Sequence, residues 1–333
     1  MKAIVLTHSG TAEVLHLQQI PDPEPAAGQA RVRLKAAGLN HRDLYQRLGY
    51  AGPGPMILGS DGAGVVDAVG DPAYDYLLGR NVVINPGLHW GDREEAQGPR
   101  FQILGNPTPG TYAEAVVVPV ENLLEKPEHL DWVQTAALPL AGLTAWRALF
   151  TQGLLRQGQT VLLPGIGSGV SGLALLLAKR AGARVLVTSS SPDKLKTAQA
   201  QGADHGVLYT DPHWEDTVRG LAGPEGIDLA VDHSGEKSVP AMTRLVRPGG
   251  RVVFMGATTG VDLKLSLRDL YFRQVHLIGT LMGSPREFQD LFRFVRMHRI
   301  TPQVHHIFPL EKTAEAHRLM ESGAQYGKII LEM

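Results

Sequence analysis

A glycine-rich segment near the middle of the chain has the residue types that bind a phosphate group. Residues 162–173 have the sequence LLPGIGSGVSGL, in which an apolar run meets several glycines and continues into an apolar helical stretch. Glycine permits a tight turn and lets backbone N–H groups approach a pyrophosphate at a helix N-terminus. The spacing Gly167-x-Gly169-x-x-Gly172 matches the dinucleotide-binding pattern, and Gly165-x-x-x-Gly169 is an alternative register. The residues predicted to bind the dinucleotide are Gly165, Gly167, Ser168, Gly169 and Val170.

The residues after the next predicted strand indicate which dinucleotide this is. An NAD-binding turn usually has an acidic residue about 20 positions after its glycines, which holds the ribose hydroxyls. Here Ser189 stands at that distance from Gly169. The hydroxyls of Ser189 and Ser190 can donate hydrogen bonds to a 2′-phosphate, and Lys194 adds a positive charge, so NADP is favoured over NAD. In an alternative interpretation, which can hold together with the first, residues 190–193 cap the next helix. For a 2′-phosphate to bind here, the carboxylate of Asp193 would need to point away from it.

Strand and helix patterns alternate on both sides of this turn. Such βαβα alternation predicts an α/β fold with a doubly wound parallel sheet. The predicted strands are residues 160–163, 184–188, 206–209, 229–231, 251–255 and 276–278, and the predicted helices are residues 131–137, 143–150, 173–180 and 193–201.

The two ends of the chain have a different pattern. The first third is rich in short strand-like runs, at residues 3–6, 14–17, 30–37 and 111–120, and residues 85–110 are expected to form a long surface excursion. The last fifty residues predict helices at 286–297 and 314–320 and a final strand at 328–331.

Composition excludes several other classes of function. The 333 residues carry 32 Lys and Arg against 33 Asp and Glu, and this net charge of −1 gives no basis for a nucleic-acid partner. The chain has no cysteine, which excludes disulfides and thiolate metal sites. Its apolar runs are too short for a signal-peptide core or a membrane span. We therefore expect a cytoplasmic protein with a small-molecule substrate and no membrane partner.

Eight short motifs are spread over the chain. They are GLNHRD at 38–43, GSDGAGVV at 59–66, GTYAE at 110–114, AALP at 136–139, GLTA at 142–145, VDHSG at 231–235, RPGG at 247–250 and GKIIL at 327–331. In this order they resemble the medium-chain dehydrogenase/reductase superfamily over nearly the whole chain. The resemblance implies a β-rich GroES-like substrate domain at residues 1–130 and 284–333, around a Rossmann-type cofactor domain at residues 131–283.

The same resemblance indicates that the metal sites of this superfamily are missing. Its alcohol dehydrogenases bind a catalytic zinc through Cys, His and Cys, and the matching positions here are Asn40, Ser60 and Leu140. Leucine cannot bind zinc, and amide and hydroxyl oxygens are poor zinc ligands. The four-cysteine lobe of those enzymes would fall within residues 85–110, which contain no cysteine. No histidines have the spacing of a metal site, so we expect no metal.

The pattern is closest to that of the zinc-free, NADPH-preferring quinone oxidoreductases. The resemblance places Asn40 near the nicotinamide ribose, Thr144 near the nicotinamide phosphate or amide, and Lys328 at a phosphate. Three alternatives stay open: Asn40 as a turn residue, Thr144 as a helix cap and Lys328 as a solvated cation. The residues that the resemblance places around the nicotinamide end are Gly256, Ala257, Thr258, Leu281, Met282 and Gly283.

Together these observations predict hydride transfer from NADPH to a quinone or another conjugated carbonyl. Such an acceptor needs no metal, because its negative charge delocalises over the conjugated system. Asn40 and Tyr45 are the predicted catalytic residues, with Tyr45 as the first candidate for the proton donor and His41, Tyr50 or water as alternatives. Arg42 and Asp43 are expected to form a local ion pair.

Two other functions and the assembly state stay open. One alternative is an alcohol dehydrogenase-like enzyme with a different metal, and the other is a nucleotide-binding relative without turnover. Relatives often pair through edge strands of their cofactor domains, which suggests a homodimer or homotetramer joined through residues 275–280.

Overall fold

The computed structural model describes residues 1–50 and 55–333, and the chain divides into two compact units. Unit 1 contains Met1–Ala141 and Gly283–Met333, and unit 2 contains Gly142–Met282. Unit 1 includes helix α2 (Trp132–Ala136), which the sequence pattern assigned to the cofactor domain. The reason is packing, because Ala136 and Ala137 are fully buried in a cluster with Ala36 and Ala63. Small side chains on both partners let this helix approach the strands closely.

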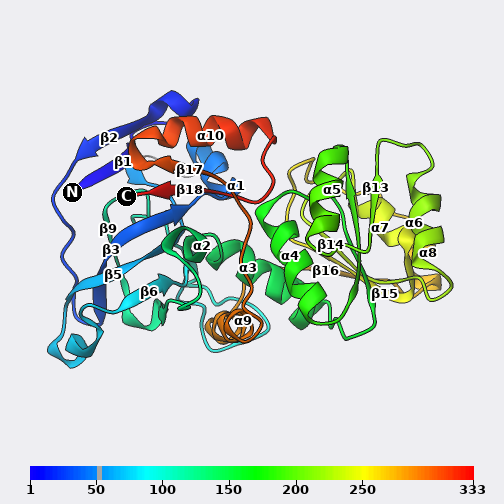
Figure 1. The fold of residues 1–333 in the computed structure, drawn as a ribbon, viewed down its shortest axis with the longest axis horizontal. Helices are drawn as coiled ribbons and strands as arrows, with labels where there is room; N and C mark the ends of the chain where they lie inside the picture. Colours follow the sequence, from blue (N-terminus) through cyan, green and yellow to red (C-terminus); the bar gives the residue numbers. More distant parts are fainter. Residues whose placement is uncertain (51–54) are drawn as a thin grey trace. The chain divides into compact units, whose positions relative to one another are not determined.

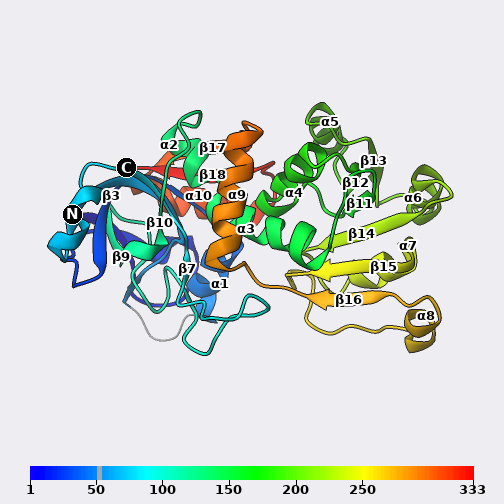
Figure 2. The same cartoon turned by 90° about the horizontal axis from the view of Figure 1, so that it is seen from below.

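Unit 2 is built on one six-stranded parallel sheet. Its strand order is β13-β12-β11-β14-β15-β16, and every pair in it is parallel. Figure 2 shows β14, β15 and β16 side by side, with β16 at the margin. This arrangement confirms the predicted Rossmann-type doubly wound sheet. The strands are β11 (Thr160–Leu163), β12 (Arg184–Ser189), β13 (His205–Leu208), β14 (Ile227–Asp232), β15 (Val246–Phe254) and β16 (His276–Gly279), and the helices are α4 (Gly169–Arg180), α5 (Pro192–Ala200), α6 (Trp214–Ala222), α7 (Val239–Leu245) and α8 (Leu267–Phe272).

The strand, turn and helix predicted around the glycines form as expected. All four residues of β11 are buried, as in the centre of a parallel sheet. Helix α4 begins at Gly169, four residues earlier than the apolar pattern indicates, because Ser168 caps it: the Ser168 Oγ accepts from the Ser171 N–H at 3.1 Å. Helix α3 (Pro139–Trp146) spans the boundary of the two units and is followed by a π-helical turn at Arg147–Gln152.

Unit 1 is β-rich and contains both ends of the chain (Figure 1). Its main sheet has the order β10-β6-β5-β3-β18-β17, and β9 also pairs with β3. The final strand therefore lies between an N-terminal strand and β17. This confirms the GroES-like unit. The strands are β1 (Lys2–Leu6), β2 (Leu15–Gln19), β3 (Gln29–Gly38), β4 (Met56–Ile57), β5 (Asp61–Val69), β6 (Asn81–Ile84), β7 (Gly87–Leu88), β8 (Gln102–Ile103), β9 (Ala115–Pro119), β10 (Leu123–Glu125), β17 (Val304–Pro309) and β18 (Lys328–Glu332), and the further helices are α1 (His41–Tyr45), α9 (Pro285–Met297) and α10 (Thr313–Ser322).

The excursion at residues 85–110 is fixed at its base and exposed at its tip. Residues 91–97 are all exposed, whereas Leu88, Trp90 and Leu104 are buried. The Trp90 ring meets the Phe101 ring edge-on, with 5.3 Å between the ring centres. No helix in the described part of the chain is long and apolar enough to cross a membrane.

A histidine on α10 is enclosed in the core of unit 1. His317 is fully buried, its Nδ1 lies 3.5 Å from the Arg47 guanidinium, and its ring meets the Tyr112 ring edge-on. Arg47 also pairs with Glu321. Burial, aided by the Arg47 charge, lowers the pKa of His317 from 6.5 to about 3. The folded protein therefore keeps this ring neutral at pH values where the unfolded chain takes up a proton.

This burial predicts an acid-sensitive contribution to stability. It is present above pH 6.5 and is lost as the pH falls towards 3, which for a histidine amounts to about 3 kcal/mol between pH 7 and pH 4. The His317→Asn variant keeps an acceptor for Arg47 and does not titrate, so its free energy of unfolding should fall less over this range. Urea unfolding of both proteins at each pH measures the difference. Asp43, whose pKa burial raises, acts in the opposite direction, but it is present in both proteins and cancels. If the free energy of unfolding falls equally with pH in the wild type and in His317→Asn, the prediction is wrong.

Candidate functional site

The glycine turn in unit 2 leaves its backbone open at the carboxyl end of β11. Gly165 and Gly167 have φ values of +64° and +125°, a region that side-chain-bearing residues rarely adopt. The first N–H groups of α4 have no acceptor within the helix, and the Ser171 N–H is the one that Ser168 satisfies. Gly169 and Val170 therefore begin a helix whose positive end can receive a phosphate.

Lys194 lies directly against this turn. A Cβ atom on Gly167 would stand 2.9 Å from the Lys194 Cδ and 3.4 Å from its Nζ. Burial lowers the pKa of the Lys194 ammonium. An anion placed beside it would offset that cost of burial. The structure thus brings the predicted cation of α5 to the predicted turn, as a phosphate-binding arrangement requires.

The serines after β12 have two different environments. Ser189 is buried and its Oγ accepts from the Ser191 N–H at 3.1 Å, which leaves its own O–H available as a donor. Ser190 is exposed. The Ser191 Oγ accepts from the Lys194 N–H at 3.3 Å and caps α5, so the helix-cap interpretation is also correct. Asp193 is exposed in the first turn of α5, where its carboxylate faces solvent.

His233, to which no role was assigned from the sequence, belongs to the same edge. Its Nε2 lies 3.2 Å from the Ser168 Oγ and 3.3 Å from the Gly165 carbonyl oxygen. Gly256 packs on it so closely that an added Cβ would stand 2.1 Å from the His233 carbonyl oxygen. The predicted segment 256–258 therefore adjoins the glycine turn through His233. The parallel order of β11, β14 and β15 explains this, because it places their carboxyl ends together, but no local sequence signal identifies His233.

The remaining residues that were predicted to bind the cofactor within the Rossmann-type domain lie in α3 and after β16. Leu281 and Met282 follow the carboxyl end of β16, where Leu281 is exposed and Met282 is buried with φ +39°. Thr144 is buried inside α3 and does not cap it. Gly283 is the first residue of the returning segment of unit 1.

Unit 1 brings Asn40 and Lys328 together around a buried carboxylate. The Lys328 Nζ donates to the Leu39 carbonyl oxygen at 2.5 Å, to the Asn40 Oδ1 at 2.7 Å and to the Asp61 Oδ2 at 2.9 Å. The Asn40 Nδ2 donates to the same Asp61 oxygen at 3.0 Å, and the Leu140 N–H donates to Asp61 Oδ1 at 2.8 Å. We name Asn40, Asp61 and Lys328 the ammonium cluster.

The ammonium cluster answers two of the open alternatives. Lys328 is 4% exposed, so it is not a solvated cation. Asn40 is the N-cap residue of α1, and its N–H donates to the Asp43 Oδ2 at 2.9 Å, so its backbone has the local structural role that the turn alternative described. All three ammonium protons of Lys328 are used inside unit 1. A contact between Lys328 and a cofactor phosphate stays a prediction, and it requires one of these bonds to be exchanged.

A zinc ion does not fit the residues at the position where the superfamily binds one. Two side chains here have oxygens that could bind a metal, the amide of Asn40 and the carboxylate of Asp61. Both already accept hydrogen bonds from the Lys328 ammonium. Ser60 directs its Oγ to the Leu104 carbonyl oxygen at 2.7 Å, and Leu140 offers only an apolar side chain. In the described ranges 1–50 and 55–333, no three His, Asp or Glu side chains are grouped as a metal site.

The polar residues of α1 differ in burial. Tyr45 and His41 are exposed on this helix, while Asp43 is buried and accepts from the Tyr112 hydroxyl at 2.8 Å. The side chain of Tyr50 lies outside what the structure describes. The expected ion pair between Arg42 and Asp43 does not form. The Arg42 guanidinium instead donates to Ser60 and Leu104, because Asp43 turns back to cap α1.

Two family profiles match the chain. The profile described as the alcohol dehydrogenase GroES-like domain matches residues 26–128, in unit 1. The profile described as zinc-binding dehydrogenase matches residues 169–296, most of which lie in unit 2.

Individual relatives cover nearly the whole chain. A zinc-type alcohol dehydrogenase-like protein of Schizosaccharomyces pombe is 32% identical over 316 residues, which are 92% of this chain and 91% of that protein. A quinone oxidoreductase of Rattus norvegicus is 29% identical over 342 residues, with 99% and 97% covered. A crystal structure described as an NAD-dependent alcohol dehydrogenase aligns with a TM-score of 0.95 at 42% identity, over 100% of both chains.

Proposed function

This chain belongs to the medium-chain dehydrogenase/reductase superfamily, and we propose that it is an NADPH-dependent oxidoreductase that reduces a quinone or another conjugated carbonyl without a metal. Membership makes the protein an oxidoreductase, and a nicotinamide nucleotide is its expected cofactor. The ammonium cluster is the main support for chemistry without a metal, because Lys328 binds the oxygens that a metal would need.

The preference for NADPH rests on the surroundings of the glycine turn. A 2′-phosphate adds negative charge, and Lys194 with the hydroxyls of Ser189 and Ser190 forms a cationic and hydrogen-bonding group beside that turn. The carboxylate that would repel such a phosphate is missing at position 189, and the nearby Asp193 faces solvent. Relatives that are described as NAD-dependent make this preference a matter for experiment.

Bound dihydronicotinamide supplies the hydride, and the protein supplies binding, orientation and a site that restricts water. The amides that open α4 would hold the pyrophosphate of the dinucleotide, and the Lys194 ammonium would bind the 2′-phosphate of NADPH. Asn40, fixed by Lys328 and Asp61, presents an amide whose position varies little. A proton for the reduced acceptor comes from water or from Tyr45, which is exposed on α1 and reachable from solvent.

Fluorescence titration with NADPH and NADH, followed by an oxidation assay over a panel of quinones and enones, tests the proposal. We expect tighter binding of NADPH and its consumption with at least one conjugated acceptor. Elemental analysis of the purified protein should give far less than one zinc per chain. Stoichiometric metal with alcohol-dependent reduction of NAD would support an alcohol dehydrogenase instead. NADPH binding without consumption across the panel would support the non-catalytic alternative.

Replacing Lys194 with Ala should weaken NADPH binding selectively. The ammonium at the turn makes a charge-assisted contact worth about 1.5–3 kcal/mol, so the Kd for NADPH should rise about 10- to 100-fold while that for NADH changes little. Lys196→Ala, a neighbouring exposed lysine of α5, is the matched control. Equal weakening of both cofactors by the Lys194 variant would show that the lysine does not bind a 2′-phosphate.

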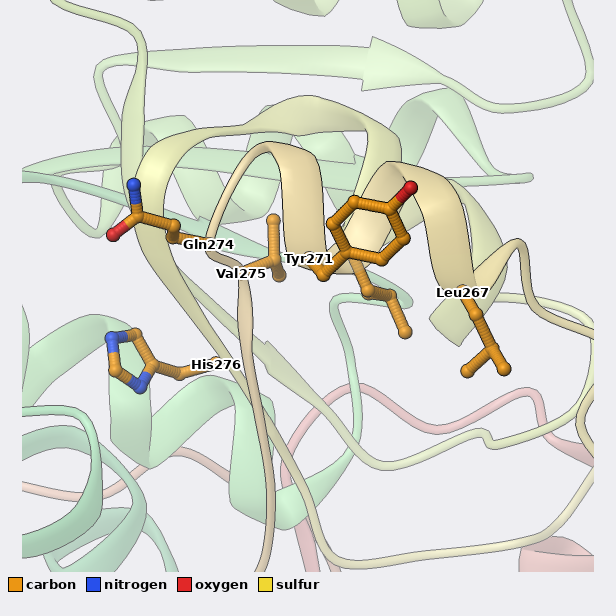
Figure 3. A pocket seen from close by; sticks show the side chains of 6 residues that line it. Leu267, Tyr271, Gln274, Val275 and His276 are labelled. Atoms are coloured by element: carbon orange, nitrogen blue, oxygen red, sulfur yellow. The ribbon is translucent and has the colours of Figure 1, made fainter.

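The proposal also includes a homodimer or homotetramer formed through the edge of unit 2. Strand β16 ends the sheet, so one side of its backbone has no strand partner within residues 1–50 and 55–333. Beside it, Leu267, Tyr271 and Phe272 of α8 are 75%, 69% and 77% exposed. Figure 3 shows Leu267 and Tyr271 extending from α8 around an open hollow that Val275 and His276 complete. A second copy would cover this apolar surface.

Sedimentation equilibrium tests the assembly, with Phe272→Glu as the disrupting variant. We expect the wild-type chain to associate and the variant to be monomeric, and a monomeric wild-type chain at micromolar concentration would rule the assembly out. The cytoplasmic location stays a prediction from the sequence.

A further inference from the structure

Arg42 holds a positive charge inside unit 1 without a carboxylate of the described residues in direct contact. It is the second residue of α1 and is partly buried. Its Nη1 donates to the Ser60 Oγ and to the Leu104 carbonyl oxygen, both at 3.1 Å, and the Gln46 amide oxygen is a further acceptor. Each of these oxygens is neutral, so the hydrogen bonds hold the guanidinium in place, while Asp43 and Asp61 attract its charge only from a distance.

The carboxylates nearest to Arg42 are used elsewhere. Asp61 pairs with Lys328 at 2.9 Å, and Asp43 accepts from the Asn40 N–H and from the Tyr112 hydroxyl. Within residues 1–50 and 55–333, Arg42 has no carboxylate as a hydrogen-bonding partner, and its Nε–H has no acceptor. Burial lowers the pKa of Arg42, which reflects the cost of holding this charge away from water.

Ser60 explains why the guanidinium has this orientation. The serine is fully buried, donates to the Leu104 carbonyl oxygen at 2.7 Å and accepts from Arg42. Both contacts fix the Nη1 end of the planar group. One N–H of Nη2 donates to the Gln46 amide oxygen at 2.7 Å. Its other N–H lies parallel to the Nε–H, and this edge of the guanidinium has no acceptor in the described part of the chain. A planar, permanently charged fork of this kind matches the geometry of an anionic oxygen.

We propose that Arg42 forms an oxyanion subsite that binds the carbonyl oxygen of the substrate. The inference rests on the proposed function and adds a substrate feature to it. In the proposed reaction a bound dihydronicotinamide would supply the hydride, so that its C–H bond breaks while a C–H bond forms at the conjugated carbon of the acceptor. The π electrons move to the carbonyl oxygen, which becomes an enolate or hydroquinone monoanion beside Arg42. A proton from water then completes the reduced product, and the cofactor leaves as its oxidised form. Ser60 is a positioning residue for this arginine.

Direct binding of an anion tests the subsite independently of turnover. The probe is 4-nitrophenolate, which resembles a hydroquinone monoanion, measured by calorimetry at a pH where the phenol is ionised. Its neutral methyl ether, 4-nitroanisole, is the matched ligand. We expect the wild-type protein to prefer the phenolate, Arg42→Gln to weaken it at least about tenfold with little effect on the ether, and Arg42→Lys to retain part of the preference. Arg293→Gln, an exposed arginine of α9, is the control for loss of one charge.

Steady-state kinetics give the second readout. Arg42→Gln should lower kcat/KM for a quinone about 100-fold, as the loss of an oxyanion donor does, with the Kd for NADPH unchanged. Arg42→Lys, which keeps the charge, guards against misfolding of the glutamine variant and should recover part of the activity. Unchanged phenolate binding in Arg42→Gln would overturn the proposal. If Arg42→Gln weakens NADPH binding as much as phenolate binding, the proposal is also overturned, because Arg42 would then bind a cofactor phosphate. A wild-type protein that binds phenolate through Arg42 but reduces no acceptor would overturn the proposed function and leave the subsite.

Discussion

Replacing Lys328 with Met is expected to lower the free energy of unfolding by about 3–5 kcal/mol, because it leaves the carboxylate of Asp61 buried without its counter-ion. Asp61 is fully buried and Lys328 is 4% exposed, so water cannot replace the lost partner. Urea unfolding followed by far-UV circular dichroism measures the change. The double variant Asp61→Asn/Lys328→Met removes both charges and should recover part of the loss.

A second lysine of unit 1 provides the control. Lys2 pairs with Glu311 at 2.7 Å, a distance close to that of the Lys328–Asp61 pair. Unlike that pair, Lys2 and Glu311 are both exposed. Water screens such a pair, so Lys2→Met should change stability little. If Lys328→Met and Lys2→Met lower the free energy of unfolding by the same amount, burial does not make the Lys328–Asp61 pair stronger than an exposed ion pair.

Replacing Gly167 with Ala is expected to weaken binding of both NADPH and NADH about 10- to 100-fold. The added Cβ meets the Lys194 side chain at 2.9 Å, and alanine cannot adopt φ +125° without strain of about 1–3 kcal/mol. Relief of this strain would move the backbone amides that we propose to bind the phosphates of the dinucleotide. Fluorescence titration of the purified variant measures the Kd for each cofactor.

Gly172 allows the same substitution without a clash. No atom lies within 4 Å of its added Cβ, and it stands inside α4, where alanine is favoured over glycine by up to about 1 kcal/mol. Gly172→Ala should therefore keep cofactor binding and slightly raise the temperature of unfolding. If Gly167→Ala also keeps full affinity for both cofactors, the dinucleotide does not bind at this turn.

Local patterns predicted the elements of the fold well. Buried β-branched and leucine runs identified β11 and β12, and the face formed by Phe288, Leu291 and Phe292 identified α9, which the structure places one residue earlier than expected. Glycine spacing predicted the turn before α4, since tight turns depend on residues close in sequence. The ends of the helices were predicted less accurately, because a single capping side chain such as Ser168 determines where a helix begins.

Long-range polar contacts were not predictable in this way. Lys328 and Asp61 are 267 positions apart, and Arg42 meets the Leu104 carbonyl oxygen across 62 positions. Nothing in the neighbouring residues indicates such partners. The resemblance to a family predicted that Asn40 and Lys328 belong to a site. It did not indicate that they touch, or that Arg42 bonds neutral oxygens and no carboxylate within the described residues. The compact unit 2 starts at Gly142, after the expected start of the cofactor domain at residue 131, because α2 packs against alanines of distant strands in unit 1.

The position of β18 also affects how the protein is made. This strand lies between β3 and β17 and supplies Lys328, but it leaves the ribosome later than the whole of unit 2. The segment Gly142–Met282 forms a continuous unit and can fold during synthesis, whereas the residues before it must wait with an open sheet edge and an uncompensated Asp61. A chain that stops before residue 328 should therefore expose the edge of β3 to proteases and chaperones, even though unit 2 is already formed.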